Sequence, residues 1–258
     1  MMDNRAIFFL GLLTFWIFGA QALACEAPKQ TPYPSLAVDG GWAVFGEMPL
    51  PKQEKVSNPV MELSLNFLDC SSGVSKLISS LPYLTDPGQI QDAFIEGTKS
   101  DHNELFVIHS VPIRSATGMG YASDYYNVLV FLKNGSGFSL DQRLTDYFGR
   151  GADVIDPDDD ADRFIYSYPY KTKDSIVAKL KSKGYERWAG GTMSEFAVIN
   201  KATIYSTQST GSATKMYLVP GDKVDVEMIS AGWVLMRYMT ANKREIKGWV
   251  MCSDLDGC

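Results

Sequence analysis

Six aspartates gather within ten residues of this chain and are the most concentrated group of potential metal ligands: Asp153, Asp156, Asp158, Asp159, Asp160 and Asp162. Asp156, Asp158 and Asp160 alternate like the first ligands of an EF-hand calcium loop, where hard oxygen ligands surround the ion. Ala161 then stands where such a loop needs glycine, and Ser167 where it needs a bidentate glutamate. We therefore predict a solvated acidic loop, in which Asp156, Asp158, Asp159, Asp160 and Asp162 are candidates for docking a basic partner. Weak cation binding is the other alternative.

Neither of the two histidines is placed like a catalytic base. His109 lies in an apolar run and is expected to be packed or hydrogen-bonded within a sheet, whereas His102 follows Asp101 in a polar, exposed turn. No Gly-x-Ser-x-Gly motif is present, and Gly149-Arg150-Gly151 lacks the lysine of a phosphate-binding loop. Carboxylate pairs for glycoside cleavage leave no spacing in sequence and stay open. We assign no catalytic residue, no cofactor and no metal site.

Residues 1–24 have the features of a removable signal peptide. Arg5 precedes an apolar run over residues 7–20, and Ala22-Leu23-Ala24 matches the small-x-small cleavage pattern. This predicts an exported, periplasmic protein whose mature chain has no transmembrane span. Two alternatives are an uncleaved anchor helix and a membrane-anchored lipoprotein through Cys25, although Ala22 stands where lipoprotein signals usually have leucine.

All four cysteines follow the predicted cleavage site, in a compartment where disulfides persist. Three pairings are open. The economical one joins Cys252 to Cys258 in a tight loop and Cys25 to Cys70 near the new N-terminus. No cysteine lies near a base or a histidine in a pattern that indicates catalysis or zinc, so we predict structural disulfide bonds.

Composition indicates a folded chain with room for two modest domains, because 45% of the 258 residues are apolar and 12% are aromatic. The net charge of −6 arises before residue 195, since residues 195–258 contain seven basic and seven acidic residues. An acidic exported chain is a poor partner for nucleic acid or anionic lipid and suits a cationic partner better.

Hydrophobic periodicity predicts a β-rich chain with a few short helices. Residues 25–59 are rich in proline and glycine and are expected to be an extended arm with one short strand at 42–45. Further strands are expected at 61–68, 104–111, 125–132 and 164–168. Helices are expected at 73–81, 87–95 and 172–183, the last ended by Gly184, and residues 138–144 fit either a strand or a helix. A glycine turn at 134–137 and a linker near 190–192 complete the outline.

The last sixty residues follow a recognisable order of short strands and turns: 202–206, 216–226, 232–238 and 247–250. Ile204, Tyr217, Val219, Val224, Val226, Val234, Met236 and Val250 alternate with polar neighbours as inward-facing strand positions do. Over residues 198–255 this order resembles a bacterial SH3-like (SH3b) domain, a small barrel. The predicted fold is therefore mainly β with minor α, with an unrecognised α+β domain at 60–190 followed by an all-β SH3-like barrel at 195–258.

The resemblance implies a binding groove for peptides, including cell-wall peptides, beside the loop after the first barrel strand. In this chain that loop is 206–215, and the candidate groove residues are Tyr205, Tyr217, Trp233 and Tyr238. For Trp233, core packing is the stronger expectation. Members of the family often have an arginine and a Gly-Pro turn here, both absent from this chain, so the type of ligand is not implied.

Three functions follow as hypotheses. The first is a non-catalytic exported binding protein of the bacterial cell envelope, which binds a cell-wall component or another exported protein. The second is a periplasmic inhibitor or immunity protein that neutralises a secreted toxin or hydrolase. The third is a peptidoglycan hydrolase targeted by its SH3b domain, although the familiar cysteine–histidine and zinc patterns are missing.

Overall fold

The protein was analysed as a computed structural model. It describes residues 25–29, 31–51, 57–98, 103–113, 120–135, 137–156, 163–192 and 195–258. The predicted signal peptide, His102 and most of the acidic loop therefore lie outside the described residues. Within these ranges the chain is mainly β with minor α, as predicted, and its strands form several antiparallel sheets.

The first sheet has the order β1-β2-β3-β4. Its strands are β1 (Leu36–Val38), β2 (Gly41–Pro49), β3 (Met61–Asp69) and β4 (Val74–Ser80). The strands expected at 42–45 and 61–68 are confirmed, but residues 36–49 pair in the sheet and are not an arm. The helix expected at 73–81 is wrong: β4 is an edge strand that bonds to β3 along one side, and its residues Val74 and Leu77 stay exposed.

The second sheet has the order β10-β8-β6-β5, with β9 added beside β8. Its strands are β5 (Gln89–Gly97), β6 (Asn103–Val111), β8 (Tyr125–Asn134), β9 (Gly137–Leu140) and β10 (Arg150–Gly151). The strands expected at 104–111 and 125–132 are confirmed. The helix expected at 87–95 is wrong, because β5 begins at Gln89 and pairs with β6 along its length. Both alternatives for 138–144 are partly right, since β9 is followed directly by a helix.

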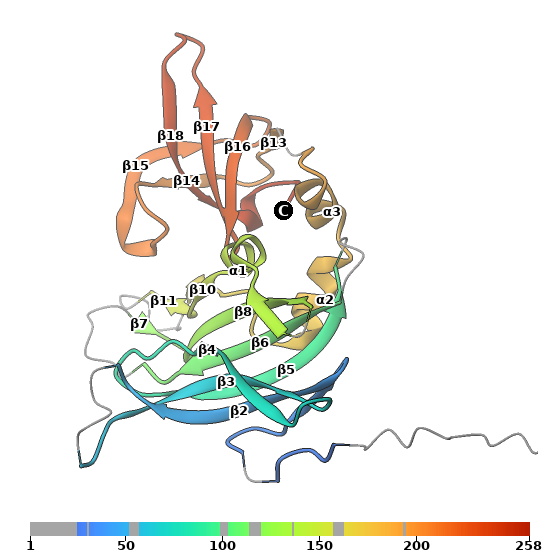
Figure 1. The fold of residues 1–258 in the computed structure, drawn as a ribbon. Coiled ribbons are helices and arrows are strands. Elements are labelled where there is room, and N and C mark those ends of the chain that lie inside the picture. Colours follow the sequence, from blue (N-terminus) through green and yellow to red (C-terminus); the bar gives the residue numbers. More distant parts are fainter. Residues whose placement is uncertain are drawn as a thin grey trace, which may run out of the picture.

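The second sheet is the middle layer of the molecule (Figure 1). One face packs on the first sheet through Leu105 and Val107 of β6, and the other face carries Phe106 and Ile108 into a second core. All four of these side chains are fully buried. A strand covered on both faces needs apolar residues at successive positions, which explains the unbroken apolar run in this part of the sequence.

Three short helices in the described ranges cover the second core: α1 (Gln142–Phe148), α2 (Lys173–Leu180) and α3 (Lys183–Ala189). Asp141, Thr172 and Ser182 cap their N-termini by accepting backbone N–H groups. Gly184 lies inside α3 and does not end the helix expected at 172–183. A Cβ at Gly184 would collide with the carbonyl oxygen of Gly257, so close packing against the C-terminal loop requires this glycine.

The C-terminal sheet has the order β13-β16-β17-β18-β14-β15, with every neighbouring pair antiparallel. Its strands are β13 (Glu195–Ala197), β14 (Ala202–Tyr205), β15 (Ala213–Leu218), β16 (Lys223–Ser230), β17 (Trp233–Met239) and β18 (Glu245–Met251). Ile204, Val224, Val234, Met236 and Val250 are buried as expected, and Val226 is half-buried against the same core. Tyr217 and Val219 are exposed, because they lie in and just after the edge strand β15.

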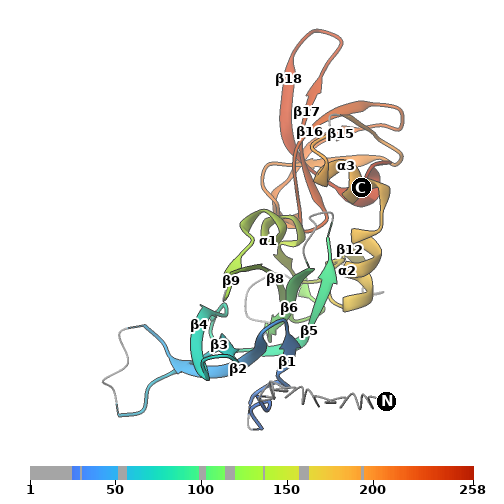
Figure 2. The ribbon, with the colours of Figure 1, turned by 45° about the vertical axis from the view of Figure 1, so that its right-hand side comes forward.

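The C-terminal sheet shares one continuous core with the helices and the second sheet. A small three-stranded sheet of β7 (Gly120–Tyr121), β11 (Val154–Ile155) and β12 (Phe164–Tyr166) lies beside this junction; the strand expected at 164–168 is confirmed in its first part. The Tyr166 hydroxyl donates to the carbonyl of Ala231, whose own N–H donates to the Tyr147 carbonyl at 3.0 Å. The first sheet and the C-terminal sheet lie at opposite ends of the molecule (Figure 2).

Two disulfide bonds confirm the predicted pairing, Cys25–Cys70 and Cys252–Cys258. The first ties the start of the described chain to the end of β3, and the second closes the C-terminal loop. Both fit an oxidising, exported environment. The lipoprotein alternative requires a free Cys25 thiol to carry the lipid. In this form the Cys25 sulfur is bonded to Cys70 and is not available for a lipid. No helix among the described residues is long and apolar enough to cross a membrane.

His109 lies fully buried in β6, as the sequence indicated. Its Nε2 lies 2.8 Å from the Pro87 carbonyl oxygen and therefore donates, which leaves Nδ1 without a proton and without a partner among the described residues. Burial lowers the pKa of His109, although the Pro87 carbonyl opposes this shift. Protonation would place a positive charge in a buried setting without a compensating charge on either cross-strand neighbour, since Ile90 and Asn127 are both uncharged.

This burial predicts a loss of stability in mild acid. Below about pH 6.5 the unfolded chain protonates this histidine before the folded chain does, so the free energy of unfolding falls by up to about 1.4 kcal/mol per pH unit. The free energy of unfolding can be measured by urea denaturation at about pH 7.5 and at about pH 5.5. Between these two pH values it should fall less for His109→Gln than for the unmodified protein. Identical losses in the two proteins would contradict a depressed pKa at His109.

Candidate functional site

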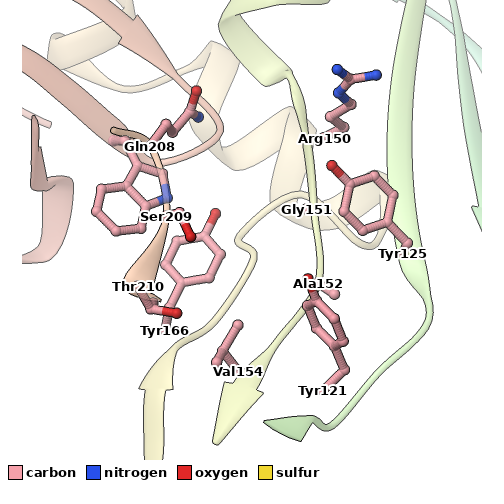
Figure 3. Close-up of a pocket in the computed structure, with 11 residues that line it drawn as sticks. Tyr121, Tyr125, Arg150, Gly151, Ala152, Val154, Tyr166, Gln208, Ser209 and Thr210 are labelled. Carbon is pink, nitrogen blue, oxygen red and sulfur yellow. The ribbon is translucent and has the colours of Figure 1, made fainter. Parts of the chain in front are cut away.

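A cleft of about 280 Å³ opens at the junction between the C-terminal sheet and the upstream sheets. Tyr121, Tyr125, Arg150 and Tyr166 line it from the upstream side, and Trp233 and the loop residues 208–210 line it from the C-terminal sheet. Figure 3 shows Gln208 and Thr210 on one wall and Tyr125 and Arg150 on the facing wall. We call this space the aromatic cavity.

The upstream wall is positioned by pairing between short and long strands. Arg150 of β10 pairs with Asn127 of β8, which places it beside Tyr125, two residues earlier in β8. Burial raises the pKa of the Tyr125 hydroxyl, and the positive charge of Arg150 opposes that rise. Tyr125 is therefore a neutral phenol at physiological pH and can donate a hydrogen bond to a ligand.

The aromatic rings of the cavity are held rigidly. The Trp233 ring centroid lies 5.2 Å from that of Tyr166 and 5.0 Å from that of Tyr205. Trp233 and Tyr205 are almost fully buried, and the Tyr166 hydroxyl is engaged with the Ala231 carbonyl. Rings that are already fixed lose little conformational entropy when a flat or apolar group packs on them.

The loop between β14 and β15 is also fixed before any ligand arrives. The Gln208 Nε2 donates to the Ser230 carbonyl at 2.9 Å. Ser212 holds the turn by donating to the carbonyl oxygens of Thr207 and Ser209, at 3.0 and 2.8 Å. This loop was predicted from the resemblance to line a groove, and its residues 208–210 line the aromatic cavity.

Arg150 and Gln208 also line a second space of about 420 Å³, on the side of α1. Asn127, Gln142 and Thr145 line it too, and we call it the amide cavity. The two cavities share Arg150 from one wall and Gln208 from the other, so they adjoin at these side chains, and we call the two cavities together the groove. Arg150 is exposed and has no ion-pair partner among the described residues.

The structure brings together only two of the four predicted groove aromatics. Tyr205 and Trp233 contact each other, and Trp233 lines the cavity while also serving the core. Tyr238 instead donates its hydroxyl to Asp222 at 3.0 Å. Tyr217 lies exposed on β15 with the Lys201 ammonium 4.3 Å from its ring centroid. Neither of these two residues lines the aromatic cavity.

The described part of the acidic run is engaged in the fold. Asp153 is buried, accepts from the Tyr168 N–H at 2.9 Å and pairs with the Lys171 ammonium at 2.5 Å. Asp156 pairs with Arg163 at 2.6 Å across the base of the loop. Asp158, Asp159, Asp160 and Asp162 lie outside the described residues, so the predicted docking loop stays a prediction.

Sequence reasoning missed the upstream wall of the cavity: Tyr121, Tyr125, Arg150 and Tyr166. One signal was present, since Arg150 stands between two glycines, and an arginine in a glycine turn is free to project toward a ligand. The tyrosines gave no signal because tyrosine is common in β-rich cores.

The cleft offers aromatic faces, neutral hydroxyl and amide groups, and the guanidinium of Arg150, which has no ion-pair partner among the described residues. Comparisons with protein-family models, with curated proteins and with solved structures found no match. The class that fold and site define is therefore a disulfide-bonded, mainly β protein with a preformed cleft between its C-terminal sheet and its upstream sheets.

Proposed function

We propose that this chain is a non-catalytic exported binding protein of the bacterial cell envelope, located in the periplasm. Its C-terminal segment would act as an SH3b-type module that binds a cell-wall component or an exported protein. One observation carries the proposal: the loop that the SH3b resemblance designates for ligand binding lines a preformed aromatic cleft. The facing wall presents Arg150, which has no ion-pair partner among the residues that the structure describes.

The binding cleft depends on the core that the C-terminal sheet shares with the upstream part of the chain. Because Trp233 and Ala231 pack on upstream residues, the binding cleft exists only when both parts of the chain are folded together. The ligand would therefore contact the upstream wall as well as the SH3b-type loop. This also means that point variants test the cleft better than removal of residues 195–258.

The test is a pull-down with the disulfide-intact protein, residues 25–258, against purified peptidoglycan sacculi and against the exported proteome of the native cell. We expect Thr210→Trp to lower retention of the ligand at least roughly 10-fold, because the indole would fill a cavity large enough for one side chain. Thr207→Trp is the matched control, since Thr207 lies in the same loop, is exposed and does not line the cavity.

The outcomes separate the hypotheses. Retention on sacculi that Thr210→Trp abolishes and Thr207→Trp leaves intact supports a wall-binding module. Recovery of one stoichiometric protein with the same variant pattern favours the inhibitor hypothesis. Equal retention by both variants would place the ligand elsewhere and overturn the proposal for this cleft.

A further inference from the structure

The charge arrangement of the groove points to the kind of group that its ligand presents. Arg150 stands where the aromatic and amide cavities meet and has no ion-pair partner among the described residues. Other charged side chains near this junction are already engaged: Asp153 with Lys171, and Arg143 with the carbonyl oxygens of Trp188 and Ala189. An unpaired guanidinium between preformed walls favours an anionic group with two oxygens, which it can hold by two parallel hydrogen bonds.

The two cavities that adjoin at Arg150 differ in chemistry, and this difference favours one orientation of the bound ligand. The aromatic cavity offers ring faces and has no acidic side chain among its lining residues. The amide cavity contains Asp146, whose Oδ1 accepts from the Gln142 Nε2 at 2.7 Å, and this carboxylate would repel an anion. The anionic group and an apolar group attached to it therefore belong on the side of the aromatic cavity.

The amide cavity is suited to a peptide main chain. Asn127, Gln142 and Thr145 offer amide and hydroxyl groups there. Asn127 is only 5% exposed, and its Nδ2 has no hydrogen-bond partner among the described residues. Peptide N–H and C=O groups hydrogen-bond to amide and hydroxyl side chains of this kind, so the lining of the amide cavity matches a main chain in extended form.

We propose that the groove binds the C-terminal end of a peptide, with its free carboxylate on Arg150, its last side chain among the rings of the aromatic cavity and its preceding residues in the amide cavity. The aromatic cavity, at about 280 Å³, has room for one apolar or aromatic side chain. This inference rests on the proposed binding function and names the chemistry that the same cleft recognises.

The probe is the tripeptide Ala-Ala-Phe, used once as the free acid and once as the C-terminal amide, in titrations of the isotope-labelled, disulfide-intact protein followed by NMR. The two peptides differ only in the charge that Arg150 is proposed to hold. We expect the free acid to bind roughly 10- to 100-fold more tightly than the amide, the range for a hydrogen bond to a charged partner. The shifted signals should be those of Tyr125, Gly151 and the Trp233 indole.

Variants then assign the preference to Arg150. In Arg150→Gln the acid and the amide should bind equally, at the level at which the unmodified protein binds the amide. Arg237→Gln is the control: Arg237 is an arginine on β17 that pairs with Glu227 at 3.2 Å and lines neither cavity. It should keep the full preference for the acid.

Three results would overturn this inference: equal affinity for acid and amide in the unmodified protein, an undiminished preference in Arg150→Gln, or no shifts at the cleft at saturating peptide. Failure of the proposed function has a different signature, since the native ligand would then still bind Thr210→Trp. If Thr210→Trp blocks the native ligand while acid and amide bind equally, the cleft is a binding site and only the carboxylate is wrong.

Discussion

Replacing Trp233 with alanine should lower the free energy of unfolding by about 3–5 kcal/mol, the range for deleting a buried aromatic side chain from a core. The ring is 3% exposed and packs between Tyr166 of the upstream part and Tyr205 of the C-terminal sheet. Its loss would leave a void between Tyr166 and Tyr205, where the upstream part and the C-terminal sheet pack against each other. Urea denaturation followed by far-UV circular dichroism measures the effect.

The same experiment reports whether the two parts unfold together. Because their core is continuous, the unmodified protein should unfold in one transition, and Trp233→Ala should move that whole transition to lower urea. Trp249→Ala is the matched control, since Trp249 is half-buried on β18 and should cost less. A separate early transition for the C-terminal sheet, or an effect no larger than that of Trp249→Ala, would contradict a shared core.

Removing the Cys25–Cys70 disulfide should cost about 4 kcal/mol, compared with about 2.4 kcal/mol for Cys252–Cys258, if the bonds act by restricting the unfolded chain. The difference follows from the lengths of chain they close, because the cysteines are 45 residues apart in the first pair and 6 in the second. The Cys25→Ser/Cys70→Ser protein should therefore unfold at lower urea than the Cys252→Ser/Cys258→Ser protein.

The second disulfide has a tertiary role that could reverse this order. The loop it closes places Gly257 against Phe196 and Gly184, and Lys179 donates to the carbonyl oxygen of Cys258. If these contacts depend on the bond, the C-terminal double variant will be the less stable one. That result would show that the bond holds native packing and does more than restrict the unfolded chain.

Local sequence patterns were sufficient to predict the strands whose side chains are mostly buried. Residues 104–111 and 125–132 are apolar at successive positions, and both form long strands of the middle layer. Residues 73–81 and 87–95 were predicted as helices and form strands. Their short amphipathic patterns fit both the helical period of about 3.6 residues and the strand period of two. They form strands because a neighbouring strand, β3 or β6, is in place to hydrogen-bond with them.

The candidate site was predicted only in part, for a related reason. The loop at 206–215 and the aromatic residues Tyr205 and Trp233 were predicted from the SH3b resemblance of the last sixty residues. Tyr217 and Tyr238 carry the same kind of side chain, yet one lies on an exposed edge and the other is bonded to Asp222. Residue type names candidates, but the face on which each lies depends on strand order and register.

The sequence by itself determined the mainly β character of the chain and indicated the burial of His109, because both depend on local composition. It favoured one of three cysteine pairings, and the fold then brought those pairs together. Tertiary structure alone decided that Arg150 faces the loop at 206–215 and that Trp233 joins two parts of the chain in one core. These residues are far apart in sequence, and only packing of the C-terminal sheet on the upstream sheets brings them into one groove. No local pattern encodes such a contact, since it depends on where separately formed surfaces meet.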